Sequence, residues 1–326
     1  MHAMTISAFG APDVLQPVEL PDPRPEAGQI TIDVTHAAVG MIDVIFRRGD
    51  RADDDRFPHP PFVPGLEVAG TVRELGPGVH EFRVGESVVT LSQMRMAGYA
   101  SVAVADAALT VSLERTGVDP SQAVAALPNA TTAYLALTKV AHLQRGEHVL
   151  VHGATGGLAS TFPAVARSLG ATRVIGTVGS TSKVEAARAL GLDLVIVSDE
   201  FPGALGGEQV DLVIDAVGGA LRKPSLDVLA PFGRMLVVGH ASTTPEEPIL
   251  GNELWQRNLG VLGFSVGPIL LAQPDLAKPA AQAVIPLIAD GTLHLAIDEL
   301  PLARAAEAHG RLERRETTGR INLTIS

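Results

Sequence analysis

The chain has 326 residues, of which 46% are hydrophobic and 19% are charged. This length suggests about two domains with large cores, and the composition excludes a disordered chain. The formal net charge of −11 argues against nucleic acid and anionic membranes as partners, and the absence of cysteine excludes disulfides, cysteine-ligated zinc and a cysteine nucleophile.

Residues 1 to about 120 contain short apolar runs that are separated by proline and glycine. Such runs predict a compact β-rich domain, with strands near 29–34, 67–73, 86–90 and 99–104. The segment Arg47–His59 carries four arginines and four aspartates around Gly49. We predict that this segment is a mobile surface loop, and the alternative is a lid over a site.

From about residue 121 the pattern changes to strands that alternate with helices. One helix is predicted over 121–138, broken at Pro128, and another over 158–169, kinked near its start by Pro163. The other predicted elements are a helix at 182–190 and buried strands at 148–152, 173–178, 194–197, 212–216 and 234–238. Strands this apolar are typical of a parallel sheet covered by helices on both faces. A helix at 303–312 and a strand at 320–325, which we expect to return to the first domain, end the chain.

The stretch 149–159 runs from an apolar strand through several glycines into a predicted helix. Gly153, Gly156 and Ala159 have the spacing of a dinucleotide-binding fingerprint, in which the glycines allow a tight turn and a close approach of the pyrophosphate. Free N–H groups at the start of the helix then face the phosphates. This pattern predicts a nucleotide site formed by Thr155, Gly156, Gly157 and Leu158, and a plain strand–helix turn is the alternative.

The end of the next strand indicates which dinucleotide is bound. A site for NAD places an acidic residue there, but no acidic residue lies between Gly153 and Val184. The strand instead ends in hydroxyl side chains and one cation, among them Ser180 and Lys183, which suit the 2′-phosphate of NADP. We therefore expect NADPH as the cofactor. The alternative is that Ser180 to Ser182 only cap the next helix.

The sequence resembles the medium-chain dehydrogenase/reductase superfamily, specifically its zinc-free, zeta-crystallin-like quinone oxidoreductase branch. The motifs that carry the resemblance lie at 39–49, 61–72, 98–100, 128–137, 149–159, 210–218 and 319–323. The resemblance implies an α/β chain with a GroES-like β-rich catalytic domain over 1–121 and 269–326. A doubly wound Rossmann domain over 122–268 would bind NADP, the cofactor would lie between the domains, and the protein would be a homodimer.

The resemblance also identifies changes at the metal site of the zinc alcohol dehydrogenases. Gly40 and Leu66 stand where those enzymes have a cysteine and a histidine ligand, so we expect no catalytic zinc. His148 and His152 are another pair to consider, but four residues of strand would separate their rings by about 13 Å, too far to share one ion. We expect these two histidines to be structural or partly exposed.

Further site residues follow from the resemblance alone. It implies cofactor contacts, mainly through the backbone, at Thr132, Val217, Gly239, His240, Phe264 and Ser265, and a substrate pocket that includes Gly40 and Asn129. Asp43 is expected to order the backbone, and Arg320 and Asn322 are weaker candidates to reach the cofactor. Many relatives have an asparagine at the position of Gly40 and a tyrosine shortly after Gly49, and both are missing here. No catalytic residue is therefore assigned.

The resemblance implies an enzyme, an NADPH-dependent and metal-independent reductase that transfers hydride to a small molecule, either a quinone or an α,β-unsaturated carbonyl. A second enzyme hypothesis is an enoyl reductase that acts on a specialised-metabolite or carrier-bound intermediate. A third is a non-catalytic NADPH-binding sensor or structural protein, which turnover with any quinone would eliminate. The N-terminus lacks a signal peptide pattern, and no apolar stretch is long enough to span a bilayer, so we expect a cytoplasmic protein.

Overall fold

The computed structural model describes residues 1–54, 57–91, 96–242, 244–245 and 247–325. The chain divides into two compact units. The first unit contains Met1–Pro128, Val266–Asp290 and Leu295–Ser326, and the second contains Asn129–Ser265 and Gly291–His294. The domain boundaries expected from the sequence, with one domain over 1–121 and 269–326 and the other over 122–268, stay a prediction.

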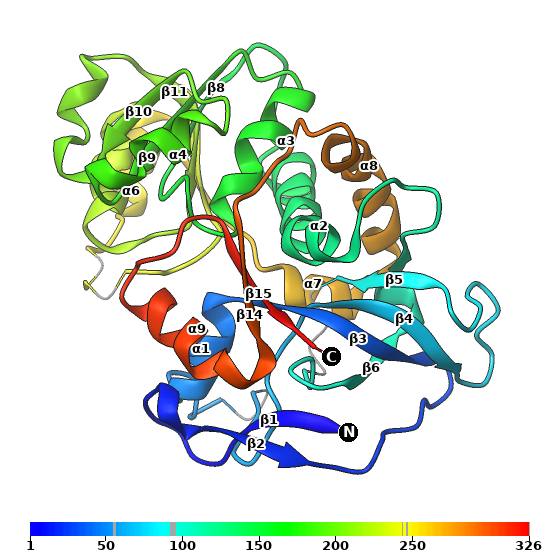
Figure 1. Cartoon of the computed structure of the whole chain (residues 1–326). Helices are drawn as coiled ribbons and strands as arrows, with labels where there is room; N and C mark the ends of the chain where they lie inside the picture. The colour runs from blue at the N-terminus through cyan, green and yellow to red at the C-terminus, as the bar shows by residue number, and fades with distance from the viewer. Residues whose placement is uncertain (55–56, 92–95, 243, 246, 326) are drawn as a thin grey trace. The chain divides into compact units, whose positions relative to one another are not determined.

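The first unit is built on a seven-stranded, mostly antiparallel sheet (Figure 1). Its strands follow the order β14 (Ile297–Pro301), β15 (Arg320–Thr324), β3 (Gln29–Val39), β4 (Val68–Leu75), β5 (Ser87–Thr90) and β7 (Thr110–Ser112), with β6 (Val102–Asp106) also paired with β3. A separate hairpin joins β1 (His2–Ile6) to β2 (Leu15–Glu19). Because β15 pairs with β3, the strand predicted at the end of the chain does return to the first part of the fold.

The core of the first unit forms where alternate apolar side chains of these strands share one face. Ile30 and Ile32 of β3 pack in one buried cluster with Met4 of β1 and with Ile321 and Leu323 of β15. The helices of this unit are α1 (Met41–Arg48), α7 (Val266–Ala272), α8 (Ala277–Ala289) and α9 (Ala305–Glu313). Helices α1 and α9 pack against each other.

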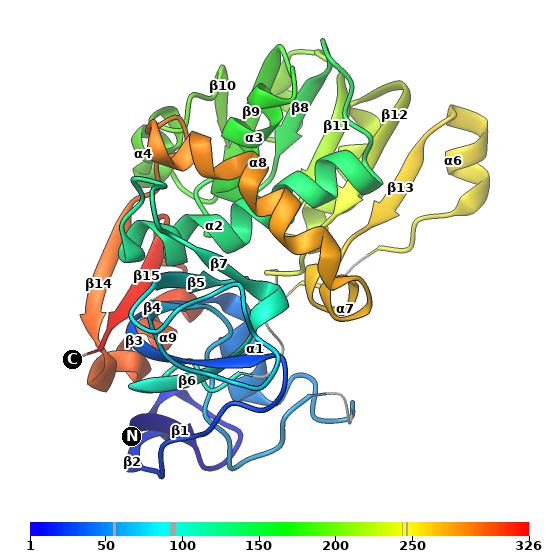
Figure 2. The same cartoon turned by 90° about the vertical axis from the view of Figure 1, so that its right-hand side faces the viewer.

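The second unit contains a parallel sheet of six strands in the order β10 (Leu194–Val197), β9 (Arg173–Val178), β8 (His148–Val151), β11 (Val210–Asp215), β12 (Leu229–Val237) and β13 (Gly260–Gly263). Figure 2 shows the strands in this order. Numbered along the chain, the order is 3-2-1-4-5-6, which is that of the doubly wound dinucleotide-binding fold. The connecting helices are α3 (Phe162–Ser168), α4 (Val184–Arg188), α5 (Arg222–Asp227) and α6 (Gly251–Arg257).

Two helix predictions are corrected. Helix α2 (Pro120–Leu135) runs through Pro128 without a break, and a π-helical turn over Ala136–Val140 follows it. Proline removes one N–H donor, but most side chains of α2 are buried, and this packing holds the helix together. The helix predicted over 158–169 is a 3-10 turn at Ala159–Thr161 followed by α3, and Pro163 is the second residue of α3. The change from a 3-10 turn to an α-helix therefore falls next to the proline.

The prediction that Arg47 begins a surface loop is wrong. Arg47 lies in the last turn of α1 and its side chain is completely buried. Its guanidinium donates to the carbonyl oxygen of Gly10 at 2.6 Å and forms an ion pair with Glu313 of α9. The charged residues around Arg47 in the sequence are typical of an exposed segment. Its burial could not be predicted from them, because Glu313, which neutralises Arg47, lies far along the chain. Residues 55 and 56 of the predicted loop lie outside the described residues.

Candidate functional site

The turn after β8 has the geometry that the glycine spacing predicts. Gly153 adopts φ +64°, and the N–H of Gly156 donates to the carbonyl oxygen of Gly153 at 2.8 Å. A Cβ at Gly153 would stand 2.9 Å from Cγ2 of Val217, so the turns after β8 and β11 lie against each other. Gly156 is exposed, and Gly157 and Leu158 are partly exposed. Side chains larger than glycine at 153 would push these two turns apart.

Two backbone donors of this turn have no acceptor within the part of the chain that the structure describes. Among the described residues, no hydrogen bond is made by the N–H of Gly157 or of Leu158. The carbonyl oxygen of Gly157 is held by the side-chain amide of Asn129, at 3.2 Å. Two N–H groups that are held in place and unsatisfied suit an anionic group such as a phosphate. This arrangement fits the pyrophosphate of a dinucleotide, and it gives Asn129 a direct contact with the phosphate turn.

The end of β9 carries the residues expected at the 2′-phosphate. Ser180 precedes a 3-10 turn at Thr181–Lys183, and its side chain makes no capping hydrogen bond to that turn. The hydroxyl of Ser180 lies 2.8 Å from that of Ser182 instead. The capping alternative therefore finds no hydrogen bond in the structure. Ser180 and Lys183 are half-buried, and Thr181 and Ser182 are exposed.

The predicted cofactor residues of the second unit gather at one edge of its sheet. Parallel strands end at a common edge, and there the turn at 155–158 follows β8, Ser180 follows β9, Val217 follows β11, Gly239 and His240 follow β12, and Phe264 and Ser265 follow β13. The chain order reverses between β8 and β11, and such a switch point is where open α/β sheets bind ligands. Thr132 is buried on α2 and is not part of this edge.

Buried polar side chains lie beneath this edge: His152, which was expected to be structural or partly exposed, and the pair of Asp215 and Arg222, which the sequence analysis missed. His152 is completely buried between the hydroxyls of Thr177, at 3.0 Å, and Ser225, at 2.7 Å. Burial lowers the pKa of His152 to about 4, so the ring is neutral at pH 7, even though the charge of Asp215 acts in the opposite direction. Asp215 and Arg222 form a buried ion pair, with Arg222 Nε 2.8 Å from Asp215 Oδ2. An aspartate that closes an apolar strand was the signal that could have indicated this network.

In the first unit, Asp43 orders the backbone as expected. Its carboxylate accepts the N–H of Gly40 at 2.8 Å and the N–H of Gly65 at 3.1 Å, and its side chain is buried. Burial raises the pKa of Asp43 to about 7, assisted by the nearby charge of Glu67 and opposed by the two backbone hydrogen bonds and by Arg320. Asp43 therefore ties the residues before α1 to those before β4, the two segments that supply zinc ligands in the zinc alcohol dehydrogenases.

Other candidates of the first unit have partners within it. Arg320 forms an ion pair with Glu67, and Asn322 donates its amide to the carbonyl oxygen of Ser121 at 2.9 Å. Tyr99 is buried and lies 3.2 Å from Nε2 of His309. Burial raises the pKa of the Tyr99 hydroxyl well above its ordinary value, so this tyrosine stays protonated. These contacts place the candidates Arg320 and Asn322, and also Tyr99, in the interior of the unit.

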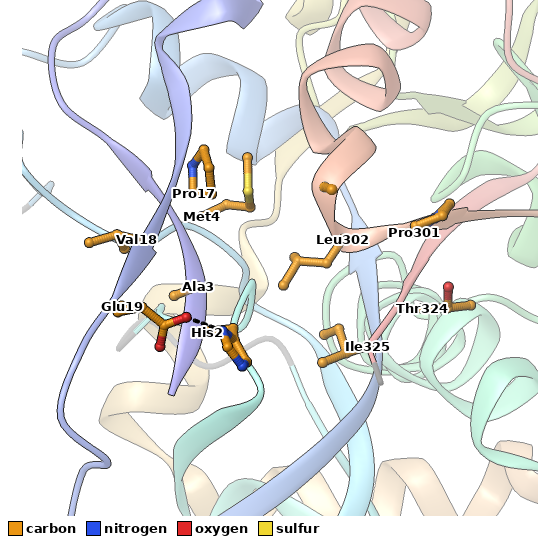
Figure 3. A pocket seen from close by; sticks show the side chains of 11 residues that line it. His2, Ala3, Met4, Pro17, Val18, Glu19, Pro301, Leu302, Thr324 and Ile325 are labelled. Carbon is orange, nitrogen blue, oxygen red and sulfur yellow. Dashed lines mark ion pairs between the residues drawn. The ribbon is translucent and has the colours of Figure 1, made fainter.

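A cavity of about 390 Å³ lies in the first unit, between the β1–β2 hairpin and the segment after β14 (Figure 3). It is lined by His2, Ala3, Met4, Pro17, Val18, Glu19, Pro301, Leu302, Ala303, Thr324 and Ile325. His2 and Glu19 form an exposed ion pair at this cavity. It contains none of the predicted site residues. Among the described residues, no group of three or more side chains is placed to hold a metal ion, and no helix is long and apolar enough to cross a membrane.

Known protein families match segments in both halves of the chain. The alcohol dehydrogenase GroES-like domain matches residues 26–115, and the zinc-binding dehydrogenase family matches residues 169–323. A 2-haloacrylate reductase from a Burkholderia species is 33% identical, with 98% of each chain covered. Quinone oxidoreductase 1 of Escherichia coli is 31% identical, with 95% of each chain covered. The structure of mycobacterial Rv1454c in complex with NADPH has a TM-score of 0.89 and 30% identity, covering 100% of both chains.

Proposed function

The chain belongs to the medium-chain dehydrogenase/reductase superfamily, in its zinc-free quinone oxidoreductase branch, and from this premise we propose that it is an NADPH-dependent, metal-independent reductase of quinones or α,β-unsaturated carbonyls. The enzyme class, an oxidoreductase, follows from the family. The cofactor and the acceptor are the proposed steps. Gly40 and Leu66, at the positions of two zinc ligands in the zinc alcohol dehydrogenases, offer no donor atom to a metal.

The observation that carries the proposal is the phosphate turn with its two unsatisfied N–H groups, at Gly157 and Leu158, at the switch point of a doubly wound sheet. Ser180 and Lys183 at the end of β9 would hold the 2′-phosphate, and this supports NADPH over NADH. The similarity to a mycobacterial structure that contains NADPH supports the same choice. When bound, NADPH would supply the hydride.

A quinone or a conjugated carbonyl accepts hydride without a strong Lewis acid, so the chain's own residues have mainly to bind and orient the reactants. Thr132, Val217, Gly239, His240, Phe264 and Ser265 are proposed for the nicotinamide half, and Gly40 and Asn129 for the substrate pocket. A relative named for 2-haloacrylate reduction supports a conjugated double bond as the acceptor. We also infer a homodimer in the cytoplasm, as the family suggests, and light scattering of the purified protein tests its mass.

The test is the oxidation of NADPH, followed at its nicotinamide absorbance, with three classes of acceptor. These are a series of quinones, a series of simple enones and 2-haloacrylates, and thioester-linked enoyl compounds. We expect turnover with the first or second class, and with NADPH in preference to NADH. Turnover with enoyl thioesters alone would favour the enoyl reductase hypothesis. NADPH binding without turnover of any acceptor would favour the non-catalytic hypothesis and refute the proposed function.

A further inference from the structure

The turns after β11 and β12 are joined by backbone hydrogen bonds. The N–H of Ser242 donates to the carbonyl oxygen of Val217 at 2.7 Å, and the N–H of Ala241 donates to that of Ala216 at 3.3 Å. These turns carry two of the residues proposed for the nicotinamide half, Val217 and Gly239. Their relative placement therefore decides where the backbone groups of both residues point.

Asp215 fixes the first of these turns from below. It is the last residue of β11 and is completely buried. Its Oδ1 accepts the N–H of Val217 at 2.9 Å and the N–H of Gly218 at 2.7 Å. Its Oδ2 accepts Nε of Arg222 at 2.8 Å. The carboxylate thus uses one oxygen for the turn after β11 and the other for the first residue of α5.

Arg222 extends the link to the second turn. Its Nη2 lies 3.4 Å from the carbonyl oxygen of Gly239, the second residue after the end of β12. Gly239 has little freedom of its own, because a Cβ at this position would stand 3.0 Å from the carbonyl oxygen of Ala216. One guanidinium therefore connects Asp215, and through it the turn after β11, to the turn after β12. A planar fork of donors can make both contacts at once, which an ammonium group could not do with the same geometry.

We propose that Asp215 and Arg222 are positioning residues, which hold the turns after β11 and β12 in the arrangement that binds the nicotinamide half of the dinucleotide. This inference rests on the proposed function. Neither side chain needs to touch the cofactor, since each acts through the backbone of the turn that it holds. The adenosine half, which is proposed to bind at the end of β9, does not depend on this pair.

The two halves of the cofactor can be separated by choice of ligand. Adenosine 2′,5′-bisphosphate carries the adenine ribose and the 2′-phosphate but no nicotinamide. We would measure its Kd and that of NADPH by calorimetry for the wild type, for Asp215→Asn and for Arg222→Met. Asparagine keeps an acceptor for the turn but places an amide donor against the donor of Arg222. Methionine keeps much of the volume of the arginine and removes its donors.

The matched control is Arg234→Met. Arg234 forms another ion pair of the same unit, partly buried, with Glu147 at 2.8 Å, and it also donates to the carbonyl oxygen of Ala141 at 2.7 Å. Glu147 precedes β8, so this pair lies at the opposite edge of the sheet from the cofactor turns. Losing either ion pair destabilises the unit, but only the loss of the Asp215–Arg222 pair should separate the two ligands.

We expect the Kd of NADPH to rise about tenfold in Asp215→Asn and in Arg222→Met, while the Kd of the bisphosphate changes less than about twofold. Arg234→Met should change neither by more than about twofold. The double variant should be no weaker than either single variant, because both break the same link. Should the single variants not fold, Arg222→Lys keeps a cation beside Asp215 and should show the same separation at about threefold.

An unchanged NADPH affinity in folded variants would overturn the inference. Equal weakening of both ligands would also overturn it, because the pair would then only support the unit as a whole. If the wild type bound the bisphosphate and NADPH equally well, the nicotinamide half would make no contact worth positioning, and the inference would fail while the phosphate turn stood. Binding of neither ligand by the wild type would refute the proposed function itself, and the inference with it.

Discussion

Replacing Asp43 by asparagine changes how the stability of the protein depends on pH. The carboxyl group is buried and its pKa is raised from its ordinary value of 3.8 to about 7, chiefly because burial disfavours the charge. The folded state therefore holds this proton more tightly than the unfolded chain does. Since protonation favours the folded state, the contribution of Asp43 to the free energy of unfolding is largest at low pH and is lost as pH rises towards 7.

The size of the effect follows from the two pKa values. At pH 5 the unfolded chain has released the proton and the folded state still holds it, which is worth about 3 kcal/mol. At pH 8 both states have lost it and the contribution is close to zero. The free energy of unfolding of the wild type, minus that of Asp43→Asn, should therefore fall by about 3 kcal/mol between pH 5 and pH 8.

The assay is urea unfolding of both proteins at closely spaced pH values from 5 to 8, followed by circular dichroism. Taking the difference between the two proteins cancels the titration of groups that they share. The hydrogen bond that asparagine loses adds a constant and does not alter the slope. Ionised Asp43 accepts the N–H groups of Gly40 and Gly65. At high pH these two segments therefore keep their hydrogen bonds to the carboxylate, although the free energy of unfolding is lower.

Asp193→Asn is the control. Partial burial acts to raise the pKa of Asp193, but the N–H of Val174 and the guanidinium of Arg167 together lower it below its ordinary value. Its contribution is therefore lost only in more acidic solution, and the difference between wild type and Asp193→Asn should stay flat from pH 5 to pH 8. A flat difference for Asp43→Asn as well would refute the reasoning, because Asp43 would then be ionised throughout this range.

Three further predictions concern other contacts. Burial, aided by the charge of Arg47, lowers the pKa of His309 to about 3, so the contribution of His309 to the free energy of unfolding is lost as pH falls below about 6.5. In urea titrations, His309→Gln should therefore lose about 2 kcal/mol less stability than the wild type between pH 8 and pH 5. An unaltered pH profile would contradict this. Gly65 has φ +101°, and a Cβ at this position would stand 2.6 Å from Cδ1 of Tyr99. Gly65→Ala should therefore lower the free energy of unfolding by about 3 kcal/mol. A melting temperature equal to that of the wild type would show that this loop can adjust. Asn129→Leu loses the contact with the phosphate turn and a polar side chain proposed for the substrate pocket, so it should raise both the Kd of NADPH and the KM of the acceptor about threefold; a KM equal to that of the wild type would contradict the placement of Asn129 in the pocket.

The fold of the second unit was predictable because its signals are local. The apolar runs at 173–178 and 194–197 match β9 and β10 residue for residue, and the glycines at 153 and 156 stand where the turn needs them. The alternation of strands and helices was enough to indicate a parallel sheet. The apolar runs separated by proline and glycine in residues 1 to about 120 also indicated the β-rich unit, the last apolar run was expected to return to it, and the resemblance to a known family added its GroES-like type.

The buried charges were not predictable, because their partners lie far along the chain. Nothing near Arg47 indicates that Glu313 will neutralise it, and a segment rich in arginine and aspartate is usually exposed. Asp215 and Arg222 are closer in sequence, but they lie seven positions apart on either side of a glycine-containing turn, one at the end of a strand and the other at the start of a helix, so no shared helix joins them. In both pairs tertiary packing decides which charged side chains are buried, and the pattern of residues near each side chain does not predict that packing.

The most direct test of the account is a fluorescence titration with NADPH and with NADH, for the wild type, for Lys183→Ala and for the control Lys139→Ala. Lys139 is an exposed lysine of the same unit, in the turn after α2. We predict that the wild type and Lys139→Ala bind NADPH at least about tenfold more tightly than NADH, and that Lys183→Ala loses most of this preference. Equal affinity of the wild type for both dinucleotides would contradict the role of Ser180 and Lys183, and binding of neither would contradict the account as a whole.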